Sequence, residues 1–240
     1  MNAEQMTDER RDRCEKHGEF TSFSSRFGWS KCGRCRDERL QAEEKAESAR
    51  LHAARVHELR AKAWIPERFA GKSFGDYEPR SSGQAAALKA CLGYVKEIQD
   101  ATREGRCLVL MGPPGVGKTH LLVATVFSAV GSLVPARYAT MSGMLAAVKG
   151  AWAWHGAEFG GDFTKPKLLV LDEVWIPQSG RDRESLLAML DERYRTQVPT
   201  LIGTNLSWPQ MREELGERFC DRLLEGGGTV VPVDGKSGRK

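Results

Sequence analysis

The second half of the chain alternates short apolar runs with longer segments in which apolar residues recur at helical spacing. Strand-like runs of this kind lie at 106–111, 134–139, 167–171, 199–203 and 229–233. Helical patterns lie between them, near 118–130, 141–153, 182–196 and 208–224. Strands that alternate with helices in this way favour a parallel sheet with helices on both faces. The pattern therefore predicts an α/β domain built on a parallel five-stranded sheet.

The first third of the chain has a different pattern. Residues 37–63 are rich in Ala, Glu, Arg and Lys and contain neither Gly nor Pro, which predicts a solvated helix with a thin apolar stripe. A second, amphipathic helix around 88–98 precedes the first core strand. These changes predict three parts: a short segment over 1–36, a helical linker over 37–66 and a globular domain over 67–240.

Residues 112–119 form a complete G-x-x-x-x-G-K-[ST] motif between a strand-like run and a helical one. In this order of elements, glycines let backbone N–H groups surround phosphates, and the helix N-terminus adds partial positive charge. We expect Lys118 to reach the β- and γ-phosphates of ATP and the Thr119 hydroxyl to hold Mg²⁺. The alternative is a glycine-rich turn without a ligand. The predicted nucleotide-binding residues of the motif are Gly112, Pro113, Pro114, Gly115, Val116, Gly117, Lys118 and Thr119.

Acidic and polar residues follow two of the later strand-like runs. Asp172 and Glu173 come directly after an apolar run, where a P-loop protein needs a carboxylate for Mg²⁺. We expect Asp172 to complete the nucleotide and magnesium site and Glu173 to polarise the attacking water; a solvated acidic turn is the alternative. Asn205 follows the next run and is either a γ-phosphate contact or an ordinary turn residue.

Two arginines, Arg218 and Arg222, are four residues apart on one predicted helical face. Arg222 could act on the nucleotide of a neighbouring subunit as an arginine finger, which stabilises charge on the transferring phosphoryl group. The same spacing supports a surface network with Asp221. The role of Arg218 is left open.

Cys14-x-x-His17 and Cys32-x-x-Cys35 form two ligand pairs separated by fourteen residues. Zinc prefers four soft or borderline ligands in a tetrahedron, and a two-residue gap lets one turn present two of them. All four positions are filled by protein, so we predict a structural zinc that supplies folding energy to a very small segment. The alternative is a redox pair of Cys32 and Cys35. The aromatic residues between the pairs form either a small core or a docking surface: Phe20, Phe23, Phe27 and Trp29.

Composition narrows the class of protein. The chain has 240 residues and a net charge of +4, which permits contact with nucleic acid without requiring it. Its apolar runs are too short to cross a membrane, and its polar start does not resemble a secretory signal. We therefore expect a cytoplasmic protein with reduced cysteines. Cys91, Cys107 and Cys220 are isolated and are expected to be buried.

With these motifs assembled, the chain resembles the AAA+ helicase loaders of the DnaC/DnaI type and the related IstB-type transposition ATPases. The resemblance spans roughly residues 64–240. It rests on Ile65-Pro66-Glu67-Arg68-Phe69, Lys118-Thr119-His120-Leu121-Leu122, Leu171-Asp172-Glu173, Gly203-Thr204-Asn205-Leu206 and Asp221-Arg222-Leu223. Gly238 stands where the family has a tyrosine, which leaves the role of Arg239 open.

The resemblance implies a P-loop NTPase with an AAA+ core and no lid domain, preceded by a zinc-binding appendage. It implies that Thr204 and Asn205 form the sensor-1 region and that Arg222 is the trans-acting finger. The zinc segment and the helix after it are similar to the helicase-docking domain of bacterial and phage loaders. The implied partners are a hexameric replicative helicase, single-stranded DNA and further copies of the chain.

The resemblance also places DNA near the helix before the acidic strand, because such loaders grip single-stranded DNA inside their ATPase assembly. Tryptophans can stack on bases while nearby cations meet phosphates. At least one of the two tryptophans in this region is expected to be core instead. The candidate DNA contacts are Lys149, Trp152, Trp154, His155, Arg181 and Arg183.

The sequence thus predicts an ATPase, with ATP, Mg²⁺ and Zn²⁺ as cofactors, that loads a replicative helicase onto single-stranded DNA in a bacterium or phage. One alternative is an IstB-like regulator of a transposase. Another is a zinc adaptor that senses ATP without hydrolysing it. A sequence-specific DNA-binding finger is disfavoured because the segment lacks a strong basic patch.

Overall fold

The structure, a computed structural model, describes residues 8–148 and 163–235. The chain divides into two compact units, Met1–Arg55 and Val56–Lys240, and each is described by itself. The division falls inside one continuous helix, α1 (Gly33–Ala61), which matches the helix predicted over 37–63. The three-part division of the sequence stays a prediction.

The N-terminal unit begins with an antiparallel hairpin that the sequence pattern did not indicate. The hairpin is formed by β1 (Glu9–Cys14) and β2 (Gly18–Ser25), and the short β3 (Gly28–Trp29) adds a third antiparallel strand next to β2. We refer to these three strands together as the hairpin. The turn from β1 to β2 closes at Gly18, which has a φ of 77° and so suits glycine. The strand β1 reads Glu-Arg-Arg-Asp-Arg-Cys and is largely exposed. Without an apolar face it carries no alternation from which a strand could be predicted.

The second unit contains the predicted parallel sheet, which covers five strands in the order β5-β6-β7-β4-β8. Each strand lies within three residues of its predicted bounds, and β6 continues past its apolar run through the acidic pair. The strands are β4 (Leu108–Met111), β5 (Ala136–Thr140), β6 (Leu168–Val174), β7 (Thr200–Thr204) and β8 (Thr229–Pro232).

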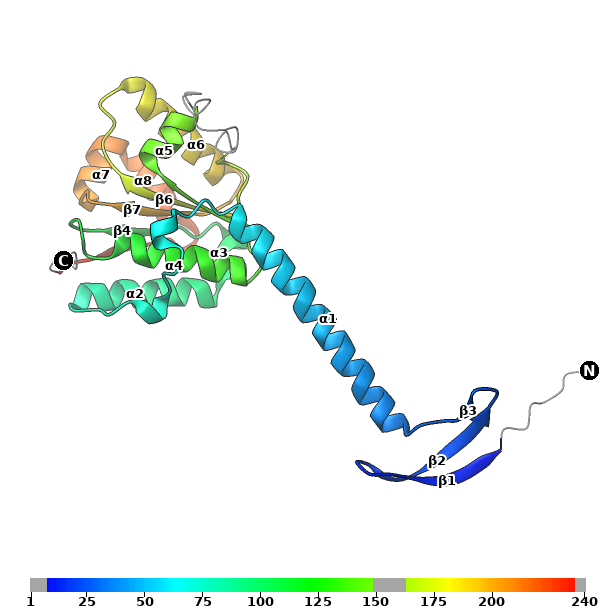
Figure 1. Cartoon of the computed structure of the whole chain (residues 1–240). Coiled ribbons are helices and arrows are strands. Elements are labelled where there is room, and N and C mark those ends of the chain that lie inside the picture. Colours follow the sequence, from blue (N-terminus) through cyan, green and yellow to red (C-terminus); the bar gives the residue numbers. More distant parts are fainter. Residues whose placement is uncertain (1–7, 149–162, 236–240) are drawn as a thin grey trace, which may run out of the picture. The chain divides into compact units, whose positions relative to one another are not determined.

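Helices cover both faces of this sheet, as Figure 1 shows for the second unit. One layer comprises α2 (Ser82–Lys96), α3 (Ile98–Glu104) and α4 (Lys118–Gly131). The other comprises α5 (Met141–Val148), α6 (Gly180–Arg195), α7 (Trp208–Leu215) and α8 (Glu217–Leu224). Short 3-10 turns lie at Glu67–Phe69, Phe74–Asp76 and Glu225–Gly227.

Alternate residues of each strand supply two separate cores. Leu108 and Leu110 of β4 pack with the α4 layer, whereas Val109 packs with the α5 to α8 layer. Successive side chains of a strand point to opposite faces, so a strand covered on both sides must be apolar throughout. This explains why the strands appear in the sequence as continuous apolar runs.

Two helix predictions are wrong in detail. The single helix expected over 208–224 is two helices, α7 and α8, because Gly216 between them has a φ of 98° and ends the first. The helix expected around 88–98 is likewise divided, into α2 and α3, at Glu97.

Four candidate DNA contacts lie outside the described residues: Lys149, Trp152, Trp154 and His155. So does Arg239. The other two candidates, Arg181 and Arg183, are exposed on the first turns of α6. Among the described residues, no helix combines the length and the apolar content that crossing a bilayer requires.

Candidate functional site

The P-loop connects β4 to α4, and close backbone packing explains two of its glycines. A Cβ atom on Gly112, whose φ is 155°, would collide with the carbonyl oxygen of Val233. A Cβ on Gly117, whose φ is 96°, would collide with the ring of Tyr77. Side chains are excluded here, so the loop keeps its backbone available at the N-terminus of α4, which favours negative charge.

Lys118 lies at the first turn of α4 and is only 8% exposed. Its ammonium donates to the carbonyl oxygens of Gly112 at 2.6 Å and Pro113 at 2.9 Å. It also donates to Oδ1 of Asn205 at 2.8 Å, although the two residues are 87 positions apart. The fold therefore brings the P-loop lysine and the polar residue after β7 into direct contact.

Asp172 lies near the end of β6 with 1% exposure, and three groups hold its carboxylate. Oδ2 accepts from the Thr119 hydroxyl at 2.6 Å and from the Tyr138 hydroxyl at 3.0 Å. Oδ1 accepts from the backbone N–H of Glu173 at 2.9 Å. On the neighbouring strand, a Cβ on Gly203 would collide with Oδ1. The paired Thr119 and Asp172 oxygens are the hard ligands that Mg²⁺ prefers.

Glu173 adopts an unusual backbone conformation, with a φ of 54°. The register between β6 and β7 shifts between Leu171 and Val174, so Glu173 lies in an irregularity of the strand. Its side chain is exposed, whereas the residues on either side of it are buried. Left-handed conformations of non-glycine residues cost free energy and cluster at functional sites, where they aim a side chain.

Most of the predicted residues line one cavity of 390 Å³. Its lining includes P-loop residues 114–119 together with Asp172, Glu173 and Asn205, but not Gly112 or Pro113. The opposite wall comes from the segment before α2, including Arg68 and Tyr77. A cavity of this volume is in the range of small-molecule sites.

The sequence pattern did not identify two further residues that line this cavity, Tyr77 and Gln84. The Tyr77 hydroxyl donates to the carbonyl oxygen of Val116 at 3.0 Å, and Gln84 donates to the same oxygen at 3.2 Å. The Tyr77 ring meets the ring of His120 edge-on at 5.3 Å. No motif marks Tyr77 or Gln84, because their role depends on contacts across the fold and not on spacing along the chain.

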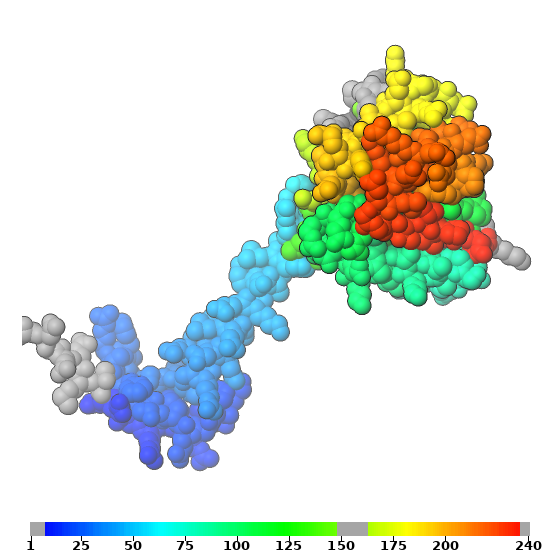
Figure 2. Space-filling model, turned by 180° about the vertical axis from the view of Figure 1, so that it is seen from behind, coloured from blue at the N-terminus to red at the C-terminus, as the bar shows by residue number. Residues whose placement is uncertain are grey.

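Arg222 lies elsewhere, in a cavity of 770 Å³ between α6, α8 and the start of β7. Figure 2 shows these helices, in yellow and orange-red, side by side on one face of the second unit. Arg222 is ion-paired with Asp191 and its guanidinium lies 4.5 Å from the ring centre of Tyr194. Asp221 pairs instead with Arg212 at 3.6 Å. Among the described residues, the two cavities share no lining residue, so Arg222 does not reach the P-loop of its own chain.

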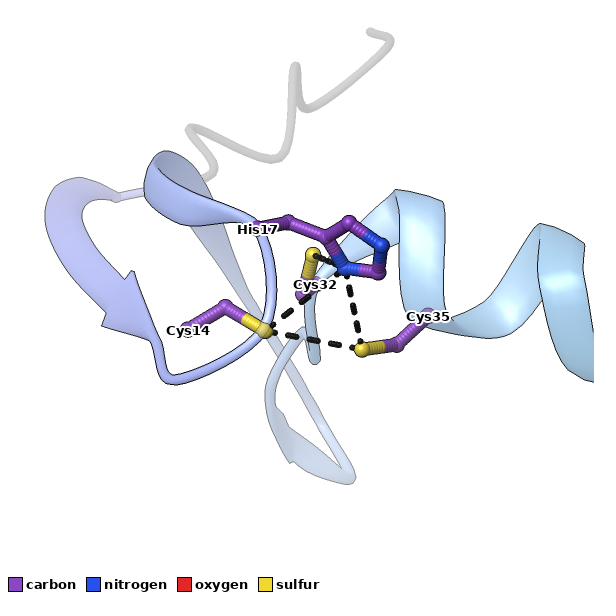
Figure 3. A group of neighbouring side chains, drawn as sticks. All are labelled: Cys14, His17, Cys32 and Cys35. Carbon is purple, nitrogen blue, oxygen red and sulfur yellow. Dashed lines mark hydrogen bonds between the residues drawn. The ribbon is translucent and has the colours of Figure 1, made fainter.

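The four predicted zinc ligands converge at the base of the N-terminal hairpin, as Figure 3 shows. The Sγ atoms of Cys14 and Cys35 are 3.5 Å apart. His17 Nδ1 lies 3.7, 3.6 and 3.3 Å from the sulfurs of Cys14, Cys32 and Cys35. A zinc tetrahedron with bonds of about 2.3 Å to sulfur and about 2.0 Å to nitrogen has edges of about 3.5 to 3.8 Å. Three of the four quoted spacings fall in that range, and the fourth, His17 Nδ1 to Cys35 Sγ at 3.3 Å, is slightly shorter.

The surroundings of the cluster fit a cation as well. Glu38 lies 3.0 Å from His17 Nε2 and so orients the ring, as carboxylates do for metal-binding histidines. The backbone N–H of His17 holds the pKa of the Cys14 thiol down to about 6, which favours the metal-binding thiolate. The side-chain hydrogen bond to Cys14 raises the pKa of Cys35 to about 11, and a central cation would oppose this.

Three of the four aromatic residues of the hairpin are exposed on its surface, whereas Phe20 is half-buried. Phe27 is 85% exposed, Phe23 is 44% exposed and Trp29 is 39% exposed. The guanidinium groups of Arg10 and Arg26 lie 4.4 and 4.8 Å from the ring centres of Trp29 and Phe27. Of the two interpretations of these aromatics, the exposed surface matches the structure.

The fold and the nucleotide cavity define a P-loop NTPase of the AAA+ type, with β7 inserted between the P-loop strand β4 and the acidic strand β6. The sequence profile of the IstB-like ATP binding proteins matches residues 38–240, and the chain belongs to that family. The predicted resemblance is thereby confirmed.

Two curated relatives illustrate the range of the family. The replicative helicase loader DnaC of Escherichia coli strain K12 is 27% identical over 158 residues, which cover 64% of this chain and 63% of the loader. The ATP-binding protein of insertion sequence IS232 from Bacillus thuringiensis subsp. berliner is 30% identical over 139 residues, 55% of each chain. This chain therefore spans less than two thirds of either relative.

Among solved structures, the crystal structure of the DnaC helicase loader superimposes with a TM-score of 0.61. The match covers 70% of this chain and all of that one at 23% identity. At this identity the likeness establishes the fold, which confirms the predicted parallel sheet flanked by helices.

Proposed function

We propose that this protein is an ATPase that loads a replicative DNA helicase onto single-stranded DNA. One observation carries the proposal: Lys118, Asp172, Glu173 and Asn205 surround a single cavity in a chain similar to a helicase loader. A protein that only kept the fold would not need all four. The proposed setting is the cytoplasm of a bacterium or a phage-infected cell.

In the proposed reaction, the P-loop backbone and Lys118 bind the phosphates of ATP. Thr119 and Asp172 would hold Mg²⁺, which supplies charge neutralisation at the phosphates. Glu173 accepts a hydrogen bond from the attacking water and so polarises it, and Asn205 orients that water or the γ-phosphate. Positioning and electrostatics dominate phosphoryl transfer. The reaction therefore also needs a positive charge next to the γ-phosphate, on the side that Lys118 does not contact.

Arg222 is proposed to supply that charge to the nucleotide of a neighbouring subunit. Its separation from the cavity of its own chain supports action in trans. To act so, Arg222 has to leave Asp191 and Tyr194. Self-association through the ATPase domains then becomes a requirement for hydrolysis.

The zinc hairpin and the helix after it are proposed to dock on the hexameric helicase. Exposed aromatic side chains next to arginines are typical of protein-binding surfaces. ATP binding would favour the state that grips single-stranded DNA, and hydrolysis would release the helicase.

The proposal is tested by co-purifying the full-length protein with the replicative helicase of its host, with and without ATP. We expect an ATP-dependent complex that the double variant Phe27→Ala, Trp29→Ala weakens while thermal stability stays unchanged. No complex under any nucleotide condition would contradict helicase loading.

A second candidate is a regulator of a transposase, which the similarity to the insertion-sequence protein favours. It predicts ATP-dependent binding to double-stranded DNA and to a transposase instead of a helicase. A third, a zinc adaptor that senses ATP, predicts nucleotide binding without phosphate release.

A further inference from the structure

Tyr138 lies in the middle of β5, at the edge of the sheet, and reaches toward the nucleotide cavity. In the parallel register, Tyr138 is opposite Val170 and Thr140 is opposite Asp172. Val170 and Asp172 are two apart on β6 and therefore share a face of the sheet. Tyr138, opposite Val170, is on that same face, the one that α4 covers. The Tyr138 ring crosses the diagonal between the strands, and its hydroxyl donates to Oδ2 of Asp172 at 3.0 Å in a buried setting.

The geometry of this contact leaves the hydroxyl one acceptor of opposite character: the Tyr138 hydroxyl is a donor and Oδ2 of the buried Asp172 carboxylate accepts its hydrogen bond. The other hydroxyl on the same oxygen belongs to Thr119, which is expected to turn its oxygen to Mg²⁺. Tyr138 can keep its bond in both states, because it is not a metal ligand.

The backbone of Tyr138 is held from the opposite direction. Its N–H donates at 2.8 Å to the carbonyl oxygen of Ala63, just past the end of α1. An edge strand otherwise leaves such groups without a partner strand. The next residue, Trp64, has a φ of 56°, lies 3.8 Å from the guanidinium of Arg137 and meets the ring of Phe163 edge-on at 5.9 Å.

One residue therefore connects two features that are far apart in the sequence. We propose that Tyr138 is a positioning residue, which orients the Asp172 carboxylate for Mg²⁺ and couples that orientation to the Ala63–Trp64 segment. The inference rests on the proposed magnesium–ATP site. It adds a route by which a change at the end of α1 reaches the metal-binding carboxylate.

The first test replaces Tyr138 with Phe, which deletes only the hydroxyl. Tyr94→Phe is the matched control, because Tyr94 is also buried and donates at 3.0 Å, but to the carbonyl oxygen of Arg106, away from the cavity. Fluorescent ADP is titrated in EDTA, and Mg²⁺ is then titrated onto the protein saturated with fluorescent ATP.

We expect Tyr138→Phe to raise the half-saturating Mg²⁺ concentration about tenfold, since hydrogen bonds to charged groups are among the stronger ones. Affinity for metal-free ADP should change less than about twofold, and Tyr94→Phe should change neither value. A merely structural role predicts a loss of both affinities together. A half-saturating Mg²⁺ concentration within about twofold of the parent's would overturn the proposal.

The second test uses Trp64→Ala to loosen the Ala63–Trp64 segment that holds the backbone of Tyr138. This variant also tests the coupling to Asp172 if Tyr138→Phe is not recovered folded. A smaller rise, about threefold, is expected, and the double variant should resemble Tyr138→Phe alone, because both act through one bond. Additive effects, or none from Trp64→Ala, would overturn the coupling. A parent protein that binds no nucleotide would instead contradict the proposed function.

Discussion

The two units of this protein are built on different principles. The nucleotide site lies over a sheet with two extensive apolar cores, so packing sets the positions of Lys118 and Asp172. In the N-terminal unit, the only buried residues among 8–55 are Ser22 and Cys32. A segment with so little apolar burial cannot offset the entropy of ordering its chain. The packed sheet of the second unit therefore positions the nucleotide site. In the N-terminal unit the dependence is reversed, and we expect metal binding at the Cys/His cluster to stabilise the fold of the hairpin.

The largest expected effect follows from removing metal. Treatment with a strong chelator, or Cys32→Ser with Cys35→Ser, should abolish the hairpin, because metal binding supplies the folding energy of such modules. The ATPase unit should keep its melting transition. Hydrogen exchange resolved along the chain checks this, with Cys107→Ser as the matched control outside the cluster. A hairpin that stays protected from exchange after metal removal would show that its fold does not depend on metal.

The next effect concerns the core of the ATPase unit. The guanidinium of Arg193 is buried and donates to the carbonyl oxygens of Phe163 and Pro199 and to the Thr200 hydroxyl. Arg193→Met should lower the free energy of unfolding by about 3 kcal/mol, because it leaves buried acceptors unsatisfied.

The matched control is Arg195→Met, two residues further on. Arg195 is exposed and pairs with Glu192 at 2.7 Å, so its loss should leave thermal unfolding unchanged. Equal destabilisation by both variants in denaturant unfolding would show that burial does not distinguish the two arginines.

The third effect acts on chemistry and leaves stability unchanged. Glu173→Gln removes the charge that polarises water but keeps the shape of the side chain, so ATP should still bind while turnover falls about a hundredfold or more. Lys118→Ala should instead abolish binding. Phosphate release and nucleotide titration separate the two. Hydrolysis by Glu173→Gln at the parent's rate would refute the role given to Glu173.

The smallest effect concerns the ion pair between Asp191 and Arg222, the arginine proposed to act in trans. Asp191→Asn weakens the hold of α6 on Arg222, and ATPase activity per subunit should rise about two- to fivefold at low protein concentration, the effect of losing a partly exposed ion pair. Arg222→Ala should abolish activity, and mixing it with Lys118→Ala protein should restore part of it. A failure of this mixture to recover would argue against action between subunits.

Much of this architecture was predictable because it depends on local pattern. The strands, the P-loop, Asp172 and the zinc ligands follow from apolar runs or fixed spacing, and the cluster geometry agrees with the ligand set. The missed features depend on partners distant in sequence. Tyr138 meets Asp172 across 34 positions, Asp191 meets Arg222 across 31, and the left-handed conformation of Glu173 arises from a register shift between strands.

In the proposed function, this protein captures magnesium–ATP, and the bound nucleotide strengthens its grip on DNA. The most direct measurement is the affinity for a fluorescent single-stranded oligonucleotide, with and without saturating magnesium–ATP, on folded, zinc-loaded protein. We predict that magnesium–ATP tightens DNA binding by at least about fivefold and that DNA tightens ATP binding by the same factor, as linkage requires. Tightening should vanish in Lys118→Ala. Calorimetry that detects no ATP binding, or DNA affinity that is the same in both conditions, would contradict the proposed function.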